Sequence, residues 1–429
     1  YLNTLIRTKG LQQMISEIVR SAIAAIWLSY DPDTMQRGFD ILRDASAAGD
    51  ADAMCFLGRC YLGEQYVWSG GGFPENDRQG LGLIAESVKR GSSAGLLCAM
   101  RCGVDIKNAP ITPLDAFNDI KVQADAGDFF CAYIIANAYF WGDILEIYPD
   151  VAKDLLDRYG SNGLEEAYNR MAYPLAVPYY EQSFESGLSS GFGNYMRICE
   201  TRYADIDQNK VFAFLKRLAQ AGSPVCCADY GVHLEYQHND AEGAFRYTKM
   251  AYDAGDKRSA YRLAGLYGRG YGVERDLDKA FELYKEAADA GNTRAYFFMA
   301  NYYFEGRGSV AVDYREAMRW LRRAYNVDGD WRAAAVMGVL YQGGLGVAAD
   351  DATAFRYLRQ AEAHIDDLWY PASGRILNAL GVAYAYGRGV GQNIPLGAKY
   401  LDMAIENDSE EAREHRKHFK KTIFGWRQK

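Results

Sequence analysis

A short motif that recurs four times in the second half of the chain constrains the fold most strongly. The motif Y-x-x-G-x-G begins at Tyr267, Tyr303, Tyr341 and Tyr384, at intervals of 36, 38 and 43 residues. A period of roughly 20 to 50 residues is typical of chains that stack one small unit, since each unit is too small to bury its own apolar face. The sequence therefore predicts a repeat solenoid rather than a set of separate globular domains.

The residues around the motif predict two helices per repeat. A large apolar residue and a small one precede each tyrosine on one helical face, as in Leu263 and Ala264. After the glycines, each repeat has a residue whose side chain suits the N-cap of a second helix: Asp276, Asp313, Asp350 and Asn393. The second helix places small, apolar and aromatic residues in one stripe and ends at a glycine suited to a left-handed C-cap, as in Ala280, Leu283, Tyr284, Ala287 and Gly291.

Diverged copies of the second helix extend the pattern toward the N-terminus. They end at Gly49, Gly91, Gly127, Gly187, Gly222 and Gly255. The predicted fold class is all-α, a right-handed alpha-alpha superhelix of about ten helix pairs. We expect residues 1–34 to hold the first helix of the first pair, 35–222 to hold diverged repeats with inserts at 62–79 and 143–172, 223–404 to hold regular repeats, and 405–429 to hold a polar capping helix over Glu410–Phe424.

This helix-pair pattern resembles the Sel-one-like repeat family, which is related to tetratricopeptide repeats but has a longer glycine-bearing loop between the helices. The resemblance is strong over residues 223–404 and looser over 35–222. It implies a scaffold or adaptor that binds other proteins. The secreted branch of the family places a disulfide within each repeat, whereas Cys55 and Cys60 fall in one predicted helix here. The cysteines are therefore interpreted as buried free thiols, which fits a reducing compartment.

Composition disfavours two classes of function. The chain has a formal net charge of -8 and a pI of about 5.4, so it lacks the overall positive field that holds a nucleic-acid backbone. The longest apolar run near the start, Ala22 to Leu28, is much shorter than the ~20 residues of a membrane span. We expect no nucleic-acid partner and no membrane span. The cytoplasm is slightly favoured as the compartment, and export stays open because the chain begins at Tyr1 rather than at a methionine.

No pattern in the sequence supports catalysis, a metal or a cofactor. The glycine-rich loops join two helices and lack the strand and the Lys-Ser/Thr pair that nucleotide loops require. His233 with His238, and His415 with His418, are pairs without further metal ligands nearby. Cys98 and Cys102 lie four residues apart among apolar neighbours, which favours inert thiols. We therefore predict no enzyme activity, no metal and no cofactor.

One set of charged residues points to binding. Nine residues before each motif tyrosine stands an arginine, and we call this set the arginine row: Arg258, Arg294, Arg332 and Arg375. Equivalent positions lie side by side in a stacked solenoid, and guanidinium groups bind carboxylates or phosphates through paired hydrogen bonds. The same register adds further candidates for the concave face: Tyr261, Phe297, Asn301, Phe304 and Tyr386. The alternative interpretation is that the arginines pair with acids of the preceding helix, such as Glu282 or Glu316.

The sequence thus predicts a non-catalytic scaffold or adaptor whose concave face binds a protein or peptide, with an acidic partner suiting the arginine row. One alternative is a dedicated inhibitor or immunity protein against a single toxin or enzyme, with the two inserts giving specificity. Another is an enzyme whose site lies in the diverged N-terminal half, around Tyr66 and Trp68.

Overall fold

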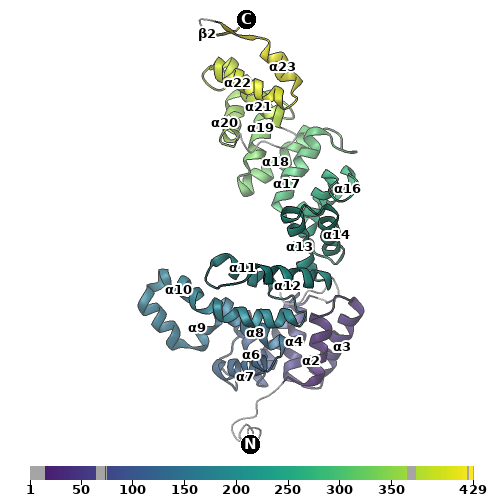
Figure 1. Cartoon of the computed structure of the whole chain (residues 1–429), viewed down its shortest axis with the longest axis vertical. Helices are drawn as coiled ribbons and strands as arrows, with labels where there is room; N and C mark the ends of the chain where they lie inside the picture. The colour runs from purple at the N-terminus through teal and green to yellow at the C-terminus, as the bar shows by residue number, and fades with distance from the viewer. Residues whose placement is uncertain (1–14, 64–72, 74, 365–372, 423–424, 429) are drawn as a thin grey trace, which may run out of the picture. The chain divides into compact units, whose positions relative to one another are not determined.

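The computed structural model describes residues 15–63, 73, 75–364, 373–422 and 425–428 of the 429-residue chain (Figure 1). These residues form an all-α solenoid with a short β-hairpin near the C-terminus. The chain divides into two compact units: the first contains Tyr1–Asn239 and Arg246–Asp256, and the second contains Asp240–Phe245 and Lys257–Lys429. Helix α14 (Ala241–Asp253) contributes residues to both units.

The first unit consists of helices of uneven length. Its elements are α2 (Glu17–Trp27), α3 (Pro32–Ala47), α4 (Ala51–Tyr61), α5 (Asp77–Lys89), α6 (Ser93–Cys102), α7 (Pro113–Asp125), α8 (Phe129–Trp141), α9 (Asp143–Ile147), α10 (Pro149–Glu185), α11 (Phe192–Thr201), α12 (Gln208–Gln220) and α13 (Pro224–Gln237). The expected insert at 143–172 forms α9 and the first part of α10, which breaks at the left-handed residue Gly160. Most of the other insert, at 62–79, lies outside the described residues, including Tyr66 and Trp68.

The second unit is more regular, and its helices follow one another in chain order in Figure 1. They are α15 (Ser259–Arg269), α16 (Leu277–Asp289), α17 (Thr293–Glu305), α18 (Tyr314–Asp328), α19 (Trp331–Gly343), α20 (Asp351–Glu362), α21 (Ser373–Tyr386), α22 (Ile394–Glu406) and α23 (Glu410–Arg416). Each first helix packs closely against the second helix of its own repeat. The paired-helix prediction is therefore confirmed for these repeats.

The C-terminus differs from the sequence prediction. The capping helix expected over residues 410–424 ends at Arg416, and two antiparallel strands follow, β1 (Phe419–Thr422) and β2 (Gly425–Gln428), with Phe419 opposite Gln428. The Phe419 side chain is buried, and its ring lies 5.0 Å from that of Tyr386. Burial of this ring stabilises an extended segment where helical periodicity predicted another helical turn.

The predicted N-caps of the second helices are confirmed. The side chains of Asp276, Asp313, Asp350 and Asn393 each accept a hydrogen bond from a backbone N–H in the first turn, at 2.8 to 3.1 Å. The backbone N–H of each capping residue in turn donates to the carbonyl of the motif tyrosine, at 2.7 to 3.1 Å. Hydrogen bonds therefore join the loop to the end of the first helix and to the start of the second. They explain why the capping residue follows the motif tyrosine by nine or ten residues.

The second glycine of the motif lies against the preceding repeat. A Cβ atom at Gly389 would overlap the carbonyl oxygen of Asp351, the first residue of α20, and one at Gly346 would lie 2.7 Å from the carbonyl carbon of Tyr314. Both glycines have positive φ angles, of 71° and 69°. Only glycine satisfies both the close approach and the left-handed backbone. The motif is therefore a contact between repeats as well as a turn.

Small residues also allow the helices of a pair to approach. A Cβ atom at Gly338 would lie 2.7 Å from Cγ of Leu358, and one at Gly381 would lie 2.7 Å from Cγ of Leu401. Ala264 and Ala300, at the equivalent positions in earlier repeats, are fully buried. The prediction that small residues at this position set the spacing of the helices is confirmed.

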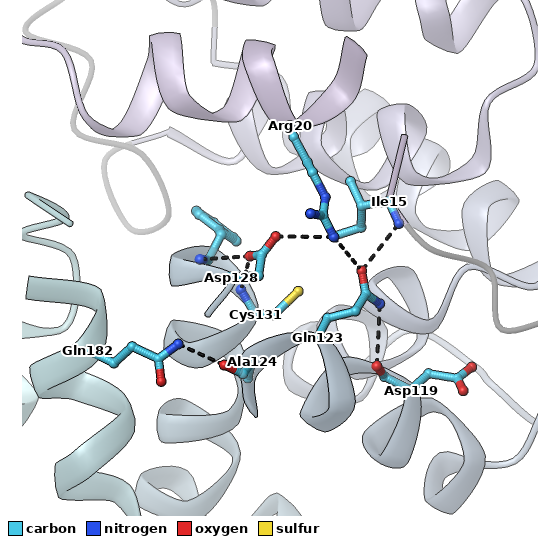
Figure 2. A network of polar contacts seen from close by, with 9 residues as sticks. Ile15, Arg20, Asp119, Gln123, Ala124, Asp128, Cys131 and Gln182 are labelled. Atoms are coloured by element: carbon cyan, nitrogen blue, oxygen red, sulfur yellow. Dashed lines mark hydrogen bonds and ion pairs between the residues drawn. The ribbon is translucent and has the colours of Figure 1, made fainter. Parts of the chain in front are cut away.

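A polar network in the first unit joins segments that are distant in sequence (Figure 2). The amide oxygen of Gln123 accepts hydrogen bonds from the Ile15 backbone N–H at 3.3 Å and from the Arg20 guanidinium at 3.0 Å. Arg20 also lies 3.4 Å from a carboxylate oxygen of Asp128, the residue that caps α8. Helix α2 is thereby held against α7 and the start of α8.

No helix among the described residues is long and apolar enough to cross a membrane.

Candidate interaction surface and a cavity in the first unit

All four residues of the arginine row lie at the N-terminus of a first helix, as the sequence predicts. Arg258 immediately precedes α15, Arg294 and Arg332 are the second residues of α17 and α19, and Arg375 is the third residue of α21. Arg258, Arg294 and Arg375 are exposed, whereas Arg332 is partly buried. Equivalent positions in three of the four regular repeats therefore present exposed arginine side chains.

Arg332 contacts residues of its own repeat and of the preceding one. Its Nε and Nη2 atoms donate to the two carboxylate oxygens of Asp330, at 3.0 and 2.6 Å. Its guanidinium also lies 4.6 Å from the ring centroid of Phe297 in α17. A cation stacked on an aromatic ring in this way contributes about 0.5 to 2 kcal/mol, depending on its exposure. Arg332 therefore has a structural role between neighbouring repeats.

The acids proposed as alternative partners are engaged elsewhere. Glu282 pairs with Lys279 at 3.2 Å and Glu316 pairs with Arg319 at 2.7 Å, each within its own helix. Arg332 pairs with Asp330 instead, and among the described residues the Arg294 guanidinium has no hydrogen bond or ion pair. Neither Arg294 nor Arg332 therefore makes the alternative pairing with Glu282 or Glu316.

Three other candidates for the concave face are not accessible. Phe297, Asn301 and Phe304 are 1%, 4% and 0% exposed, so they cannot form a surface for a partner. The Arg375 guanidinium lies 4.8 Å from the ring centroid of Phe304, just as Arg332 covers Phe297. The prediction failed because periodicity identified the correct helix face but gave no information on how closely the next repeats cover it.

The two remaining candidates are tyrosines that are partly buried. The Tyr261 ring packs edge-on against Tyr284 and Phe298, with centroids 5.8 and 5.7 Å apart. The Tyr386 hydroxyl lies 2.6 Å from Nδ1 of His418, in the segment after α23. Burial raises the pKa of Tyr386. Both side chains therefore have packing roles, and direct contact of either with a partner stays a prediction.

A cavity of about 440 Å³ lies in the first unit and was not predicted. We call it the α4–α8 cavity, because most of its lining comes from α4, α6 and α8. The lining residues are Arg59, Ala94, Leu97, Cys98, Arg101, Tyr133, Ile134, Asn137, Trp141, Asp143, Gly191, Gly193 and Asn194. Its volume is in the range of small-molecule sites, and it combines apolar walls with a few polar groups, as such sites do.

The polar groups of this cavity are held by specific contacts. The Arg59 side chain is buried, with its guanidinium 5.1 and 5.8 Å from the ring centroids of Phe130 and Tyr133. Arg101 forms an ion pair with Asp143. Burial raises the pKa of Asp143, although the neighbouring Arg101 opposes that effect. The two guanidinium groups and one carboxylate give the cavity lining a net positive charge.

A regularity in the sequence marks this cavity, although the arginine search did not extend to the diverged repeats. Arg59, Arg101 and Asn137 each stand ten residues after one of the helix-ending glycines Gly49, Gly91 and Gly127. They therefore occupy equivalent positions in three successive first helices. This position differs from that of the arginine row, which lies three residues after such a glycine, as in Gly291 and Arg294.

The thiol and the carboxylate of the cavity are poorly suited to catalysis at neutral pH. A hydrogen bond from Cys102 lowers the pKa of Cys98, but contact with Cys55 and burial outweigh it and raise the pKa to about 12. Cys98 is therefore a protonated thiol rather than a nucleophile. Asp143 is engaged by Arg101 and is not placed to act as a general base. The lining is better suited to binding than to proton transfer.

The other candidates for metal or thiol chemistry form pairs at most. His233 and His238 approach to 3.2 Å, and the Cys98 and Cys102 sulfurs lie 3.9 Å apart. His415 and His418 have separate partners, Asn378 and Tyr386. In the part of the chain that the structure describes, no three His, Cys, Asp or Glu side chains are grouped so that they could hold a metal ion.

Three solved structures of bacterial proteins are similar to this chain. A protective antigen of uropathogenic Escherichia coli that displays an SLR fold is 20% identical over 97% of this chain and 90% of its own, with a TM-score of 0.48. A Sel1 repeat protein from Oxalobacter formigenes is 23% identical over 56% of this chain and 97% of its own, with a TM-score of 0.42. An immunity protein from Pseudomonas aeruginosa is 15% identical over 73% of this chain and 81% of its own, with a TM-score of 0.22. At these scores the similarities carry no argument about function.

Six segments of the chain match a known repeat family. No curated protein matches this chain. The Sel1 repeat profile matches residues 51–83, 224–256, 257–292, 293–327, 331–364 and 377–409. These segments contain the capped helix pairs and the glycine contacts described above. The chain therefore contains six Sel1 repeats.

Proposed function

We propose that this chain is a non-catalytic scaffold whose second unit binds an acidic segment of a partner protein through Arg258, Arg294 and Arg375. The observation that carries the proposal is the exposure of these three arginines at equivalent positions in three of the four regular repeats. Each arginine can form two parallel hydrogen bonds to a carboxylate and keeps its charge at any physiological pH. A segment with several Asp or Glu residues could therefore engage more than one repeat.

The location of the arginines favours anions further. Each stands at the N-terminus of a helix, where the aligned peptide dipoles give a partial positive charge. The helix dipole itself does not favour a guanidinium at that position, since like charges repel. A carboxylate bound there would interact favourably with both the side chain and the helix end. The arrangement thus fits recognition of anions.

The test uses a fluorescein-labelled peptide of ten glutamates, with a peptide of ten glutamines as the neutral control. Fluorescence anisotropy would measure the affinity of the glutamate peptide for the wild-type chain and for the double variant Arg258→Glu/Arg294→Glu. We expect binding to weaken at least about tenfold, and the affinity of the wild type to fall as salt is raised.

Two controls make the result specific. Arg258→Lys/Arg294→Lys keeps the charge but loses the paired hydrogen bonds, so it should bind with intermediate affinity. Lys420→Glu reverses a charge far along the chain in the C-terminal strand and should have little effect. Equal affinity of the wild type and the Arg→Glu variant for the glutamate peptide would contradict the proposal.

A further inference from the structure

The α4–α8 cavity presents three hydrogen-bond donors from three successive repeats. Arg59 comes from α4, Arg101 from α6 and Asn137 from α8, and α6 contacts both neighbouring helices. Equivalent positions in a stacked solenoid lie next to one another, so these donors meet at one wall of the cavity. Asn137 is 6% exposed and Arg59 is also 6% exposed, which leaves the cavity as the space that they face.

Hydrogen bonds orient the Asn137 amide. Its Oδ1 atom accepts from the Tyr180 hydroxyl at 2.8 Å and from Nδ2 of Asn194 at 3.0 Å. With the oxygen occupied by two donors, the Nδ2 group is the part of the amide left to interact with a ligand. Asn137 therefore adds a neutral donor beside the two guanidinium groups.

The charges in the cavity favour an anion. Arg59 and Arg101 supply two positive charges, and Asp143 is the only carboxylate among the lining residues. Asp143 already pairs with Arg101, which demonstrates that a carboxylate is accommodated at this wall. The rings of Phe130 and Tyr133 hold the Arg59 guanidinium in place, so a ligand would meet a cation that is already oriented.

The other walls are apolar or aromatic. Leu97 and Ile134 are buried on them, and Trp141 is 54% exposed. An exposed tryptophan at the mouth of a cavity can pack against an apolar group of a ligand. The cavity thus combines an anion-binding wall with a surface for an apolar side chain.

We propose that the α4–α8 cavity binds a carboxylate attached to an apolar group, as found in a peptide. Arg59, Arg101 and the Asn137 amide bind the carboxylate, and Trp141 with Leu97 and Ile134 contacts the apolar group. This site is in the first unit and is separate from the arginine row, so it goes beyond the function proposed above. The carboxylate has two possible sources, a peptide C-terminus or an Asp or Glu side chain.

The first experiment identifies the ligand chemistry with small probes. Isothermal titration calorimetry would compare N-acetyl-phenylalanine, which carries a terminal carboxylate, with N-acetyl-phenylalaninamide, which differs only in lacking that charge. We expect the acid to bind at least about tenfold more tightly than the amide. An N-acetyl-aspartyl-phenylalaninamide probe, with a side-chain carboxylate only, distinguishes the two sources. Binding of both carboxylate probes no tighter than that of the neutral amide would overturn the proposal.

The second experiment locates the binding with a substitution that the fold can accept. Gly193 is exposed in the first turn of α11, lines the cavity, and has no heavy atom within 4 Å of an added Cβ. Gly193→Glu would place a competing carboxylate at the cavity, whereas Gly193→Gln adds the same bulk without charge. We expect the Glu variant to weaken binding of the tighter carboxylate probe at least about fivefold relative to the Gln variant. Equal affinities of the two variants would overturn the proposed location.

Discussion

The two units apply one repeat plan with different regularity. In the second unit, the motif glycines lie against the start of the preceding second helix in one repeat after another, at Gly346 and Gly389 for example. In the first unit, α9 and the long α10 interrupt the succession, and a cavity of about 440 Å³ opens beside them. Regular spacing packs the repeats closely and leaves their shared positions at the surface. Irregular spacing leaves room inside the unit, where a different repeated position places polar side chains around a cavity.

The largest expected effect tests the glycine contact of the regular unit. Gly389→Ala would force a Cβ against the Asp351 carbonyl at a positive φ, and we expect it to lower the free energy of unfolding by about 2 to 5 kcal/mol. Gly291 also has a positive φ, but no heavy atom lies within 4 Å of an added Cβ, so Gly291→Ala should cost only about 1 to 2 kcal/mol. Urea unfolding measures both. Equal losses of unfolding free energy in the two variants would mean that the glycine motif is a turn and not a contact between repeats.

The next prediction concerns a buried carboxylate of the first unit. Asp52 is 5% exposed, and burial raises its pKa to about 6, although the Ser92 hydroxyl opposes this by donating a hydrogen bond at 2.5 Å. The folded state therefore holds the proton more tightly than the unfolded state, whose pKa is about 3.9. Stability should fall as the pH rises from about 4 to 6, by roughly 3 kcal/mol in total, and stay reduced above that range.

Asp52→Asn removes this titration. Thermal unfolding at several pH values should find the variant more stable than the wild type at pH 8 but not at pH 4. Asp350 in the second unit is the matched control, because hydrogen bonds from Thr353 lower its pKa, so its contribution is present at neutral pH and is lost as the pH falls. If the difference in melting temperature between Asp52→Asn and the wild type did not change with pH, the buried Asp52 carboxylate would not be the cause of the pH dependence of stability.

A smaller effect separates the structural arginine from the exposed ones. Arg332→Gln removes both the Asp330 pair and the contact with the Phe297 ring, and we expect a loss of about 1 to 2 kcal/mol. Arg294→Gln, at the equivalent position of the preceding repeat, should change stability by less than about 0.5 kcal/mol. Urea midpoints of the two variants provide the comparison. A larger loss for Arg294→Gln would assign that residue to the fold rather than to a partner.

The regular repeats could be predicted from sequence because their signals are local. The side chain of Asp276 reaches a backbone N–H three residues away, and the glycine at Gly291 ends the helix that contains it. Position in the arginine row also follows from spacing alone. Burial of Phe297 and Phe304 could not be predicted in this way, since it depends on arginines that follow 35 and 71 residues later in the chain.

The features that were missed depend on non-local packing. The strand at Phe419 forms where its ring is buried against Tyr386, 33 residues earlier, and the local sequence favours continuing the helix. The α4–α8 cavity needs α4, α6, α8 and the turn before α11 to meet. The equivalent positions of Arg59, Arg101 and Asn137 could be predicted, but the space beside them could not, because it depends on how the irregular segment after α8 packs.

The most direct test of the central claim is affinity capture on the full-length chain followed by mass spectrometry, performed in parallel with wild type, Arg258→Glu/Arg294→Glu and Gly193→Glu. The account predicts that the double arginine variant loses proteins that the wild type retains at low salt, and that Gly193→Glu still retains them. Retention of the same proteins at the same yield by the wild type and the arginine variant would contradict it.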